Sequence, residues 1–172
     1  MEHQGHDHDG CCKSSGSSVS QSLKEMDFQR GIWYAAQTDD LNRVEKLLRS
    51  GASPSEEDSA GYTALHYAAR SGSYEICKLL LDHGVDINAV TRCGRATALH
   101  RAATRSNDKI IQLLLNSRAD ANIQDSDGYT ALHRAALSGS KSTWDLLAPR
   151  TNQNLLDNKG RTALDLLEPE NP

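Results

Sequence analysis

The sequence has little positive charge, few aromatic residues and no long apolar run. Its 172 residues carry a formal net charge of −4, so no overall positive field attracts the chain to nucleic acid or to anionic lipid. Aromatic residues make up 5% of the chain, which provides few rings on which nucleic-acid bases can stack. The longest apolar stretches, such as residues 79–81, are far shorter than the roughly 20 residues of a membrane-spanning helix. We therefore expect a soluble protein with neither nucleic-acid nor membrane partners.

Cysteine is also scarce, and its spacing does not match a disulfide scaffold. The four cysteines are Cys11, Cys12, Cys77 and Cys93, and no apolar signal segment precedes them. Disulfides are rare in reducing compartments, so we expect an intracellular protein. No basic cluster is dense enough to indicate nuclear import, so a cytoplasmic location, a nuclear location, or both remain open.

The motifs of common catalytic sites are missing as well. The sequence contains no Gly-x-x-x-x-Gly-Lys phosphate loop, no Gly-x-Ser-x-Gly nucleophile turn and no His-x-Glu followed by a cysteine pair. We therefore expect no enzymatic activity, no cofactor and no catalytic residue.

The first 22 residues differ in composition from the rest of the chain. They are rich in His, Asp, Gly and Ser and contain one aliphatic side chain, Val19. Such a segment cannot bury enough apolar surface to offset the entropy lost on ordering. We predict a disordered tail over residues 1–22, with order beginning near Leu23 and Asp27 acting as a helix N-cap.

The same tail supports an alternative function, that of a metal or redox sensor. Nitrogen and sulfur donors for zinc or copper are present, namely His3, His6, His8, Cys11 and Cys12. Adjacent cysteines do not match the spacing of a zinc knuckle, so we assign no metal ligand. Cys93 would contribute to such a sensor, because Arg92 and Arg95 accompany it in a hairpin with one extra residue and would lower the pKa of its thiol.

What the chain does contain is an internal repeat. Thr-Ala-Leu-His begins at residues 63, 97 and 130 and returns as Thr-Ala-Leu-Asp at residue 162, with spacings of 34, 33 and 32 residues. Ala-Ala pairs recur with nearly the same period, and a leucine-rich stretch follows each pair. A period of this length is typical of stacked helical repeats that share one elongated core.

A period near 33 with Gly-x-Thr-Ala-Leu-His-x-Ala-Ala, a turn and a leucine-rich stretch resembles the ankyrin repeat over residues 27–168. The family's usual form has proline after the threonine, where this chain has Ala64, Ala98 and Ala131. The resemblance implies an all-α solenoid of four repeats plus a truncated C-terminal half-repeat, with short hairpin-like loops. The expected domain covers residues 23–168 before a tail at 169–172, and its copies occupy about 27–59, 60–93, 94–126 and 127–158, with a cap at 159–168.

Each recurring residue of the motif has a structural role in such a stack. We expect the threonine hydroxyl to cap the helix start, the leucine to enter the core and the histidine ring to tie the turn to the helix. We interpret His66, His100 and His133 as joints, meaning side chains that link neighbouring copies. They are not expected to be ligands of one metal, because helix packing holds successive copies about 10 Å apart. Cys77 is expected to be buried in an outer helix.

The terminal copies have one neighbour each and should differ from the others. Trp33 stands where the histidine would be, and we expect it to cover an exposed end rather than to continue the histidine pattern. At the other end, Pro169 should stop the fifth copy after a short helix.

The turns between helices predict a weak region. Gly72 and Gly139 occur where a helix should end in a left-handed conformation, but Ser106 stands at that position in the third copy, and Arg118 replaces the glycine that ends the outer helix. Each non-glycine residue in that conformation costs about 1 kcal/mol, so we predict that residues 104–120 are locally weak. The outer helix of the fourth copy should end early, at Pro149.

The candidate binding site follows from the resemblance. In proteins with such repeats, partners commonly dock on the concave side, which is built from hairpin tips and the ends of the inner helices. Tyrosine and arginine are typical binding anchors, and the corresponding positions here hold Tyr62, Arg70, Arg92, Arg95, Arg101, Thr104, Arg105, Tyr129, Arg134 and Leu137.

Acidic residues 56–58 precede the second copy, so we expect this groove to be basic in the middle and negative toward its N-terminal end. The expected partner of the monomer is another protein, bound through an acidic or mixed-charge segment. The alternative is a merely solvated charged face.

Overall fold

The computed structural model of the protein describes residues 31–167. The predictions for the tail at 1–22, for the first ordered residue Leu23, for the cap at Asp27 and for the stop at Pro169 lie outside the described residues. The division of the chain into copies at the expected boundaries stays a prediction.

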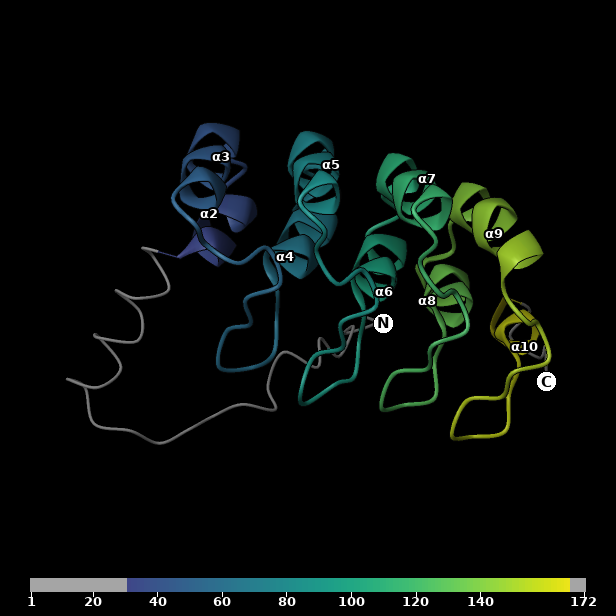
Figure 1. Ribbon diagram of the computed structural model, residues 1–172. Helices are drawn as coiled ribbons and strands as arrows, with labels where there is room; N and C mark the ends of the chain where they lie inside the picture. The colour runs from purple at the N-terminus through teal and green to yellow at the C-terminus, as the bar shows by residue number, and fades with distance from the viewer. Residues whose placement is uncertain (1–30, 168–172) are drawn as a thin grey trace, which may run out of the picture.

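Within residues 31–167 the chain forms two rows of helices (Figure 1). The inner row consists of α2 (Ile32–Gln37), α4 (Ala64–Ser71), α6 (Ala98–Thr104), α8 (Ala131–Ser138) and α10 (Ala163–Leu167). The outer row consists of α3 (Leu41–Arg49), α5 (Tyr74–Asp82), α7 (Asp108–Asn116) and α9 (Lys141–Leu147), and the 3-10 turn η1 (Ala148–Arg150) follows α9. Each inner helix is paired with the outer helix that follows it, and α10 has no such partner among the described residues. This arrangement confirms the all-α repeat solenoid with a half-repeat at its end.

The two rows differ in the size of their buried side chains. Ala68, Ala69, Ala102 and Ala103 on the inner helices have no exposed surface, so neighbouring inner helices pack closely. The outer helices fill the space between copies with larger side chains, including Ile76, Leu80, Ile110 and Leu114. Contact between neighbours is more extensive in the inner row than in the outer row. The stack therefore bends toward its inner helices, and the hairpins extend from that side (Figure 1).

The threonine and histidine of each tetrapeptide form a capping box at the start of an inner helix. The Nδ1 atoms of His66, His100 and His133 accept hydrogen bonds from the backbone N–H of Thr63, Thr97 and Thr130 at 3.1, 3.1 and 3.2 Å. Because a backbone N–H can only donate, Nδ1 carries no proton and the ring proton lies on Nε2.

The protonated Nε2 donates across the joint between copies. His66 bonds the carbonyl of Ala96 at 3.0 Å, and His100 bonds that of Tyr129 at 2.9 Å. The carbonyl of Arg161 lies 3.3 Å from Nε2 of His133. Each ring therefore ties its own helix to the following hairpin, as the histidine prediction requires.

The expectation for Trp33 is wrong in one respect. Its indole Nε1–H donates to the carbonyl of Glu56 at 2.8 Å, so it makes the same kind of bond to the next loop as the histidines do. Trp33 thus continues the pattern with a different ring. In the last copy Asp165 takes this position and accepts from the backbone N–H of Thr162 at 2.7 Å. An ionised carboxylate cannot donate onward, which suits a copy with no described neighbour beyond it.

The predicted left-handed turn positions are confirmed. Gly72 and Gly139 have φ of 88° and 67°, and Ser106 and Arg118 have φ of 53° and 66° without the freedom of glycine. The α-helix of the fourth copy ends at Leu147 and passes into the turn that contains Pro149, so its early end is also confirmed. The weakness of residues 104–120 stays a prediction.

We expect Ser106→Gly and Arg118→Gly each to raise the free energy of unfolding by about 1 kcal/mol, because glycine adopts positive φ without the clash of a Cβ atom. Urea denaturation measures the change. Ser117→Gly is the matched control, since Ser117 has φ of −85° and glycine should lower stability there. Equal effects at residues 117 and 118 would rule out the explanation by left-handed strain.

Candidate protein-binding face

Four hairpins project from the inner-helix side of the stack (Figure 1). Asp58, Asp125 and Asp157 each open one of them and close it by a backbone bond to the carbonyl four residues later. Oδ1 of each aspartate also accepts two hairpin amide protons, at 2.8–3.0 Å. Asx turns of this kind fix a hairpin tightly because the side chain replaces a backbone acceptor.

We count each hairpin with the inner helix that follows it, so the hairpin of residues 91–96 belongs with α6 to the third copy. This hairpin is built differently. Thr91 opens it, and the closing bond runs to the carbonyl of Ala96, one residue further along than in the other copies. Arg95 occupies the position of positive φ, at 50°, which is glycine in the other three hairpins. The extra residue inferred from the sequence is therefore confirmed. Neighbouring hairpins are joined by single backbone bonds, such as that from Ser126 to Gly94 at 2.9 Å.

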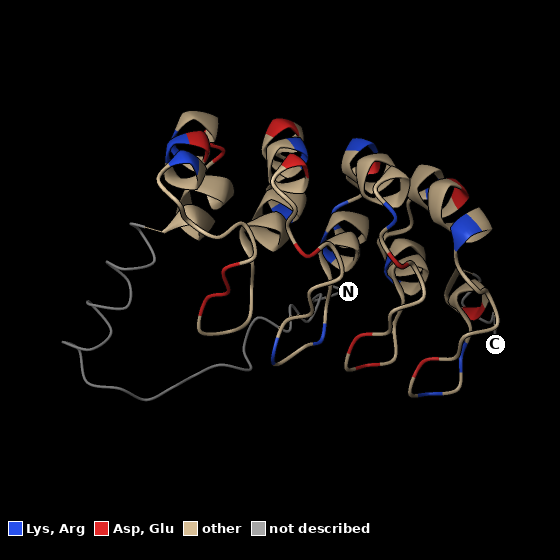
Figure 2. Ribbon diagram, viewed as in Figure 1, with Lys and Arg blue, Asp and Glu red and all other residues tan. Residues whose placement is uncertain are grey.

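Charge is distributed unevenly over the hairpins (Figure 2). The hairpin before α6 contains Arg92 and Arg95 and no acidic residue, whereas the hairpins on either side contain acidic residues. The negative flank is thus not confined to the N-terminal side, because Asp125 and Asp127 lie in the following hairpin. The basic region is bounded on both sides.

The structure places every predicted site residue on a hairpin or an inner helix. Tyr62, Arg92, Arg95 and Tyr129 belong to hairpins, and Arg101 and Arg134 to the inner helices α6 and α8. The four remaining residues lie at the C-terminal ends of the inner helices: Arg70, Thr104, Arg105 and Leu137. The exposed members of the set are Arg92, Arg95, Thr104, Arg105 and Leu137, and the others are half-buried.

Two arginine–tyrosine stacks stand on this face. The Arg101 guanidinium lies 5.0 Å from the centroid of the Tyr62 ring, which belongs to the preceding copy, and it also donates to the Tyr62 hydroxyl. The Arg134 guanidinium lies 4.7 Å from the ring of Tyr129 in its own copy. Stacking over a ring face is favourable for a cation, and it holds each guanidinium in one orientation.

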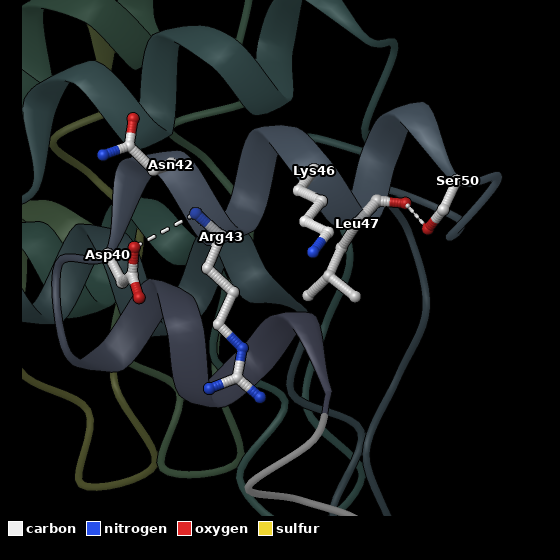
Figure 3. Close-up of a pocket in the computed structure, with 6 residues that line it drawn as sticks. All are labelled: Asp40, Asn42, Arg43, Lys46, Leu47 and Ser50. Carbon is white, nitrogen blue, oxygen red and sulfur yellow. Dashed lines mark hydrogen bonds between the residues drawn. The ribbon is translucent and has the colours of Figure 1, made fainter.

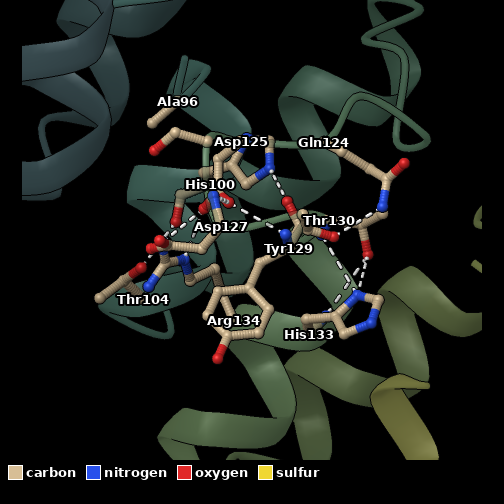
Figure 4. A network of polar contacts seen from close by, with 12 residues as sticks. Ala96, His100, Thr104, Gln124, Asp125, Asp127, Tyr129, Thr130, His133 and Arg134 are labelled. Atoms are coloured by element: carbon tan, nitrogen blue, oxygen red, sulfur yellow. Dashed lines mark hydrogen bonds and ion pairs between the residues drawn. The ribbon is translucent and has the colours of Figure 1, made fainter. Parts of the chain in front are cut away.

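Arg134 is committed to contacts within the protein (Figure 4). Its Nε donates to Oδ2 of Asp125 at 3.0 Å, its Nη2 donates to the same oxygen, and Asp127 lies 3.5 Å from Nη2. The side chain of Asp125 is 1% exposed, so the pair is well shielded from solvent. The charge of Arg134 is therefore neutralised internally, and this arginine supports the hairpin rather than standing ready for a partner.

Sequence reasoning missed several residues that shape the face. The Tyr67 hydroxyl donates to Oδ2 of Asp58 at 2.6 Å, and its ring centroid lies 5.5 Å from that of Tyr62. Arg161 donates to Oδ2 of Asp157 and, at 3.1 Å, to the hydroxyl of Tyr129. Tyr67 occupies the position that Arg101 and Arg134 hold in the next two copies, so comparing the residue after each histidine of the tetrapeptide would have found it.

A surface depression lies elsewhere, on the outer helix α3 of the first copy (Figure 3). It is lined by Asp40, Asn42, Arg43, Lys46, Leu47 and Ser50. Asp40 caps α3 by accepting from the backbone N–H of Arg43 at 3.0 Å, and Ser50 bonds the carbonyl of Leu47 at 2.8 Å. None of the predicted site residues lines this depression, and its Asp40 and Ser50 serve the two ends of α3.

The residues of the alternative sensor are placed only in part, because the tail donors lie outside the described residues. Among residues 31–167 no group of three or more His, Cys, Asp or Glu side chains is arranged to hold a metal ion. Burial raises the pKa of the Cys77 thiol to about 12, which agrees with its predicted role in packing. Cys93 is exposed, and its predicted low pKa stays a prediction.

None of the helices between residues 31 and 167 has the length and apolar character that a membrane span requires.

Comparison with known proteins identifies the repeat. A family model described as ankyrin repeats (3 copies) matches residues 32–125 and 99–167. Ankyrin repeat domain-containing protein 39 from Homo sapiens is 52% identical over 86 residues, which cover 48% of this chain and 47% of that protein. Its counterpart from Bos taurus is 56% identical over 66 residues, 37% of this chain and 36% of the relative.

A larger protein contains the same kind of segment. Palmitoyltransferase akr1 from Neurospora crassa is 38% identical over 125 residues, which cover 72% of this chain but 17% of that protein. The chain thus matches about half, or less, of the length of each of these relatives. The match of the repeat model to both halves of the described solenoid shows that the chain belongs to the ankyrin-repeat family.

Proposed function

We propose that this protein is a non-catalytic adaptor or scaffold whose concave face binds an acidic or mixed-charge segment of another protein. Ankyrin repeats are a protein–protein interaction module, and the rigid stack of joints described above suits that role. The observation that carries the proposal is the basic surface of the third copy, formed by Arg92, Arg95, Arg101 and Arg105. This set is called the third-copy basic patch below.

Exposure and charge support this surface as the binding region. The side chains of Arg95 and Arg105 are exposed and form no ion pair with a residue of the described range. Arg92 lies 3.3 Å from Glu57, but their side chains are 62% and 41% exposed, and such exposed pairs stabilise a protein little. A partner carboxylate can therefore compete for these arginines, and complementary charge also speeds encounter.

The remaining parts of the proposal concern the absence of other activities. The similarity to palmitoyltransferase akr1 is limited to 17% of that protein, and we propose no catalytic role and no cofactor for this chain. The proposed protein is an intracellular monomer, cytoplasmic, nuclear or both, that binds neither nucleic acid nor membrane.

Reversing the charge of Arg95 and Arg105 tests the proposal. We expect Arg95→Glu/Arg105→Glu to reduce the affinity for partners captured by the intact chain at least about tenfold, because two attractive contacts become repulsive. We leave Arg134 unchanged, since glutamate there would face the buried Asp125. Quantitative mass spectrometry of captured proteins, followed by titration of the main partner, measures the effect.

The control is Lys109→Glu/Arg150→Glu, which makes the same change in net charge on the outer side of the stack. Both variants should keep the helical circular dichroism of the parent protein. If the double variant at residues 95 and 105 retains every partner, or if the control loses them equally, the third-copy basic patch is not the binding surface.

A further inference from the structure

The hairpin before α6 lacks the aspartate that opens each of the other three described hairpins. Those hairpins begin with Asp58, Asp125 and Asp157, whereas the hairpin before α6 begins with Thr91, which is 2% exposed. Its hydroxyl accepts from the backbone N–H of Ala96 at 3.1 Å. Thr91 therefore reproduces the backbone role of the aspartates but brings no carboxylate.

In the other copies, the second oxygen of that aspartate holds a side chain of the concave face. Oδ2 of Asp125 binds Arg134, and Oδ2 of Asp157 binds Arg161 at 2.8 Å. In the second copy, Oδ2 of Asp58 accepts from Tyr67 at 2.6 Å. Arg134 and Arg161, both half-buried, are thus each bound by the aspartate that opens the adjoining hairpin.

Arg101 has no such carboxylate. Within residues 31–167 its side chain bonds only the Tyr62 hydroxyl, while its guanidinium stacks on the Tyr62 ring at 5.0 Å. Its Nε is buried and is the one buried side-chain nitrogen or oxygen in the described range with no hydrogen-bond partner. Leaving a charged donor group incompletely bonded costs free energy, so a carboxylate that bonds the other nitrogens of this guanidinium would be stabilised.

The surroundings of Arg101 favour an external carboxylate. The guanidinium is oriented in advance by the tyrosine stack, and a planar guanidinium binds a carboxylate through two parallel hydrogen bonds. The exposed Arg95 and Arg105 belong to the same copy and add positive charge. Asp58, in the preceding copy, already accepts bonds from Ala60, Tyr62 and Tyr67.

We propose that Arg101 is the recognition point for an Asp or Glu side chain of the bound protein segment, which takes the role that Asp125 has toward Arg134. This inference rests on the proposed function and names the chemistry that the concave face recognises. A C-terminal carboxylate offers the same chemistry and is distinguished by the experiment below. The Arg134 site, already occupied by Asp125, is an internal reference for it.

The first experiment follows the Nε–H signals of Arg101 and Arg134 by heteronuclear NMR of the full chain. The probe is an N-acetylated, C-amidated Gly/Ser peptide with a central Asp-Glu pair. Its Asn-Gln counterpart and a Gly/Ser peptide with a free C-terminus serve as comparisons. We expect the Arg101 signal to shift in a saturable way, with a Kd on the order of 1 mM for so few contacts, while the Arg134 signal stays in place.

Thr91→Asp provides the decisive variant, because it gives the third copy the carboxylate of the other copies. The new carboxylate should form an intramolecular ion pair with Arg101. We expect it to reduce the affinity for the Asp-Glu peptide at least about tenfold. Gln112→Glu, an exposed position on α7, makes the same change in net charge and should leave binding unchanged. Arg101→Met, which keeps the apolar stem of the side chain, should also abolish binding of the Asp-Glu peptide. This second variant tests the proposal if Thr91→Asp does not fold.

Several outcomes would overturn the proposal. These are a static Arg101 signal, equal shifts at Arg101 and Arg134, full binding by Thr91→Asp, or a response to the free C-terminus but not to the Asp-Glu peptide. If Arg101→Met keeps the captured partners that Arg95→Glu/Arg105→Glu loses, this recognition point is wrong and the proposed function stands. If both variants keep them, the proposed function is wrong as well.

Discussion

Lowering the pH from 7.5 to 5.0 is expected to reduce the free energy of unfolding by about 4 kcal/mol, a large part of the stability of an ordinary domain. The cause is the burial of His66 and His100. Burial lowers the pKa of each ring from 6.5 to about 4, despite the hydrogen bond that each donates to a carbonyl. His133 shifts in the same direction, also through burial.

The direction of the effect follows from proton binding. Between pH 6.5 and 4 the unfolded chain protonates these histidines, whereas the folded protein keeps them neutral because Nδ1 must accept the threonine N–H. The unfolded state therefore gains protons as the pH falls, and stability is lost through this window. At pH 5 the free energy of unfolding is lower by about 2 kcal/mol for each of the two rings.

Urea denaturation at a series of pH values measures this loss. His100→Gln removes one titrating ring but keeps a capping-box side chain, so it should lose about half as much stability over the same range. His83→Gln is the control, since His83 is exposed at the end of α5; the loss of stability should persist in this variant because His66 and His100 are unchanged. A stability that stays level between pH 7.5 and 5.0 would contradict the assignment of these rings as buried neutral joints.

Gly128→Ala is expected to lower the free energy of unfolding by about 3 kcal/mol, combining left-handed strain with overpacking. Gly128 has φ of +80°, and a Cβ atom there would lie 2.8 Å from the backbone nitrogen of Asn158 and 3.0 Å from the carbonyl carbon of Asp157. These are backbone atoms of the next hairpin, which cannot move aside as a flexible side chain can. The bond from Asn158 to the carbonyl of Asp127, at 3.0 Å, should be disrupted.

Gly160→Ala separates the two contributions. Gly160 has φ of +74° in the last hairpin, but a Cβ atom there would meet nothing within 4 Å. Gly160→Ala should lower the free energy of unfolding by about 1 kcal/mol, because it introduces strain in the backbone conformation alone. Thermal or urea denaturation compares the two variants. Equal losses would mean that the close approach of neighbouring hairpins does not constrain Gly128.

Much of the fold was accessible from the sequence because its signals are local. A capping box joins residues three positions apart, and a left-handed turn depends on the residue that occupies it. The sequence therefore predicts correctly the cap formed by Thr97 and His100, the left-handed turn at Gly72 and the non-glycine turn at Ser106. The period itself then placed successive copies in a stack, since each copy must bury its apolar side against a neighbour.

The candidate binding face, which stays a prediction, was accessible only in outline. Its residues were found by their position in the repeat, but the sequence does not show which charges remain available. Arg101 and Arg134 occupy the same repeat position, and yet one reaches back to Tyr62 while the other is bound to Asp125. Trp33 was likewise assigned to an end, although its ring bonds the next loop.

The repeat, its helices, its capping boxes and its turn conformations depend on residues close together along the chain, and the amino-acid order is therefore enough to predict them. Which arginines are neutralised internally, and which lack a carboxylate, depends instead on contacts between copies. Arg101 meets Tyr62, 39 residues away, only after two copies have stacked, and the strength of a charge contact depends on the burial and geometry that arise in that stack.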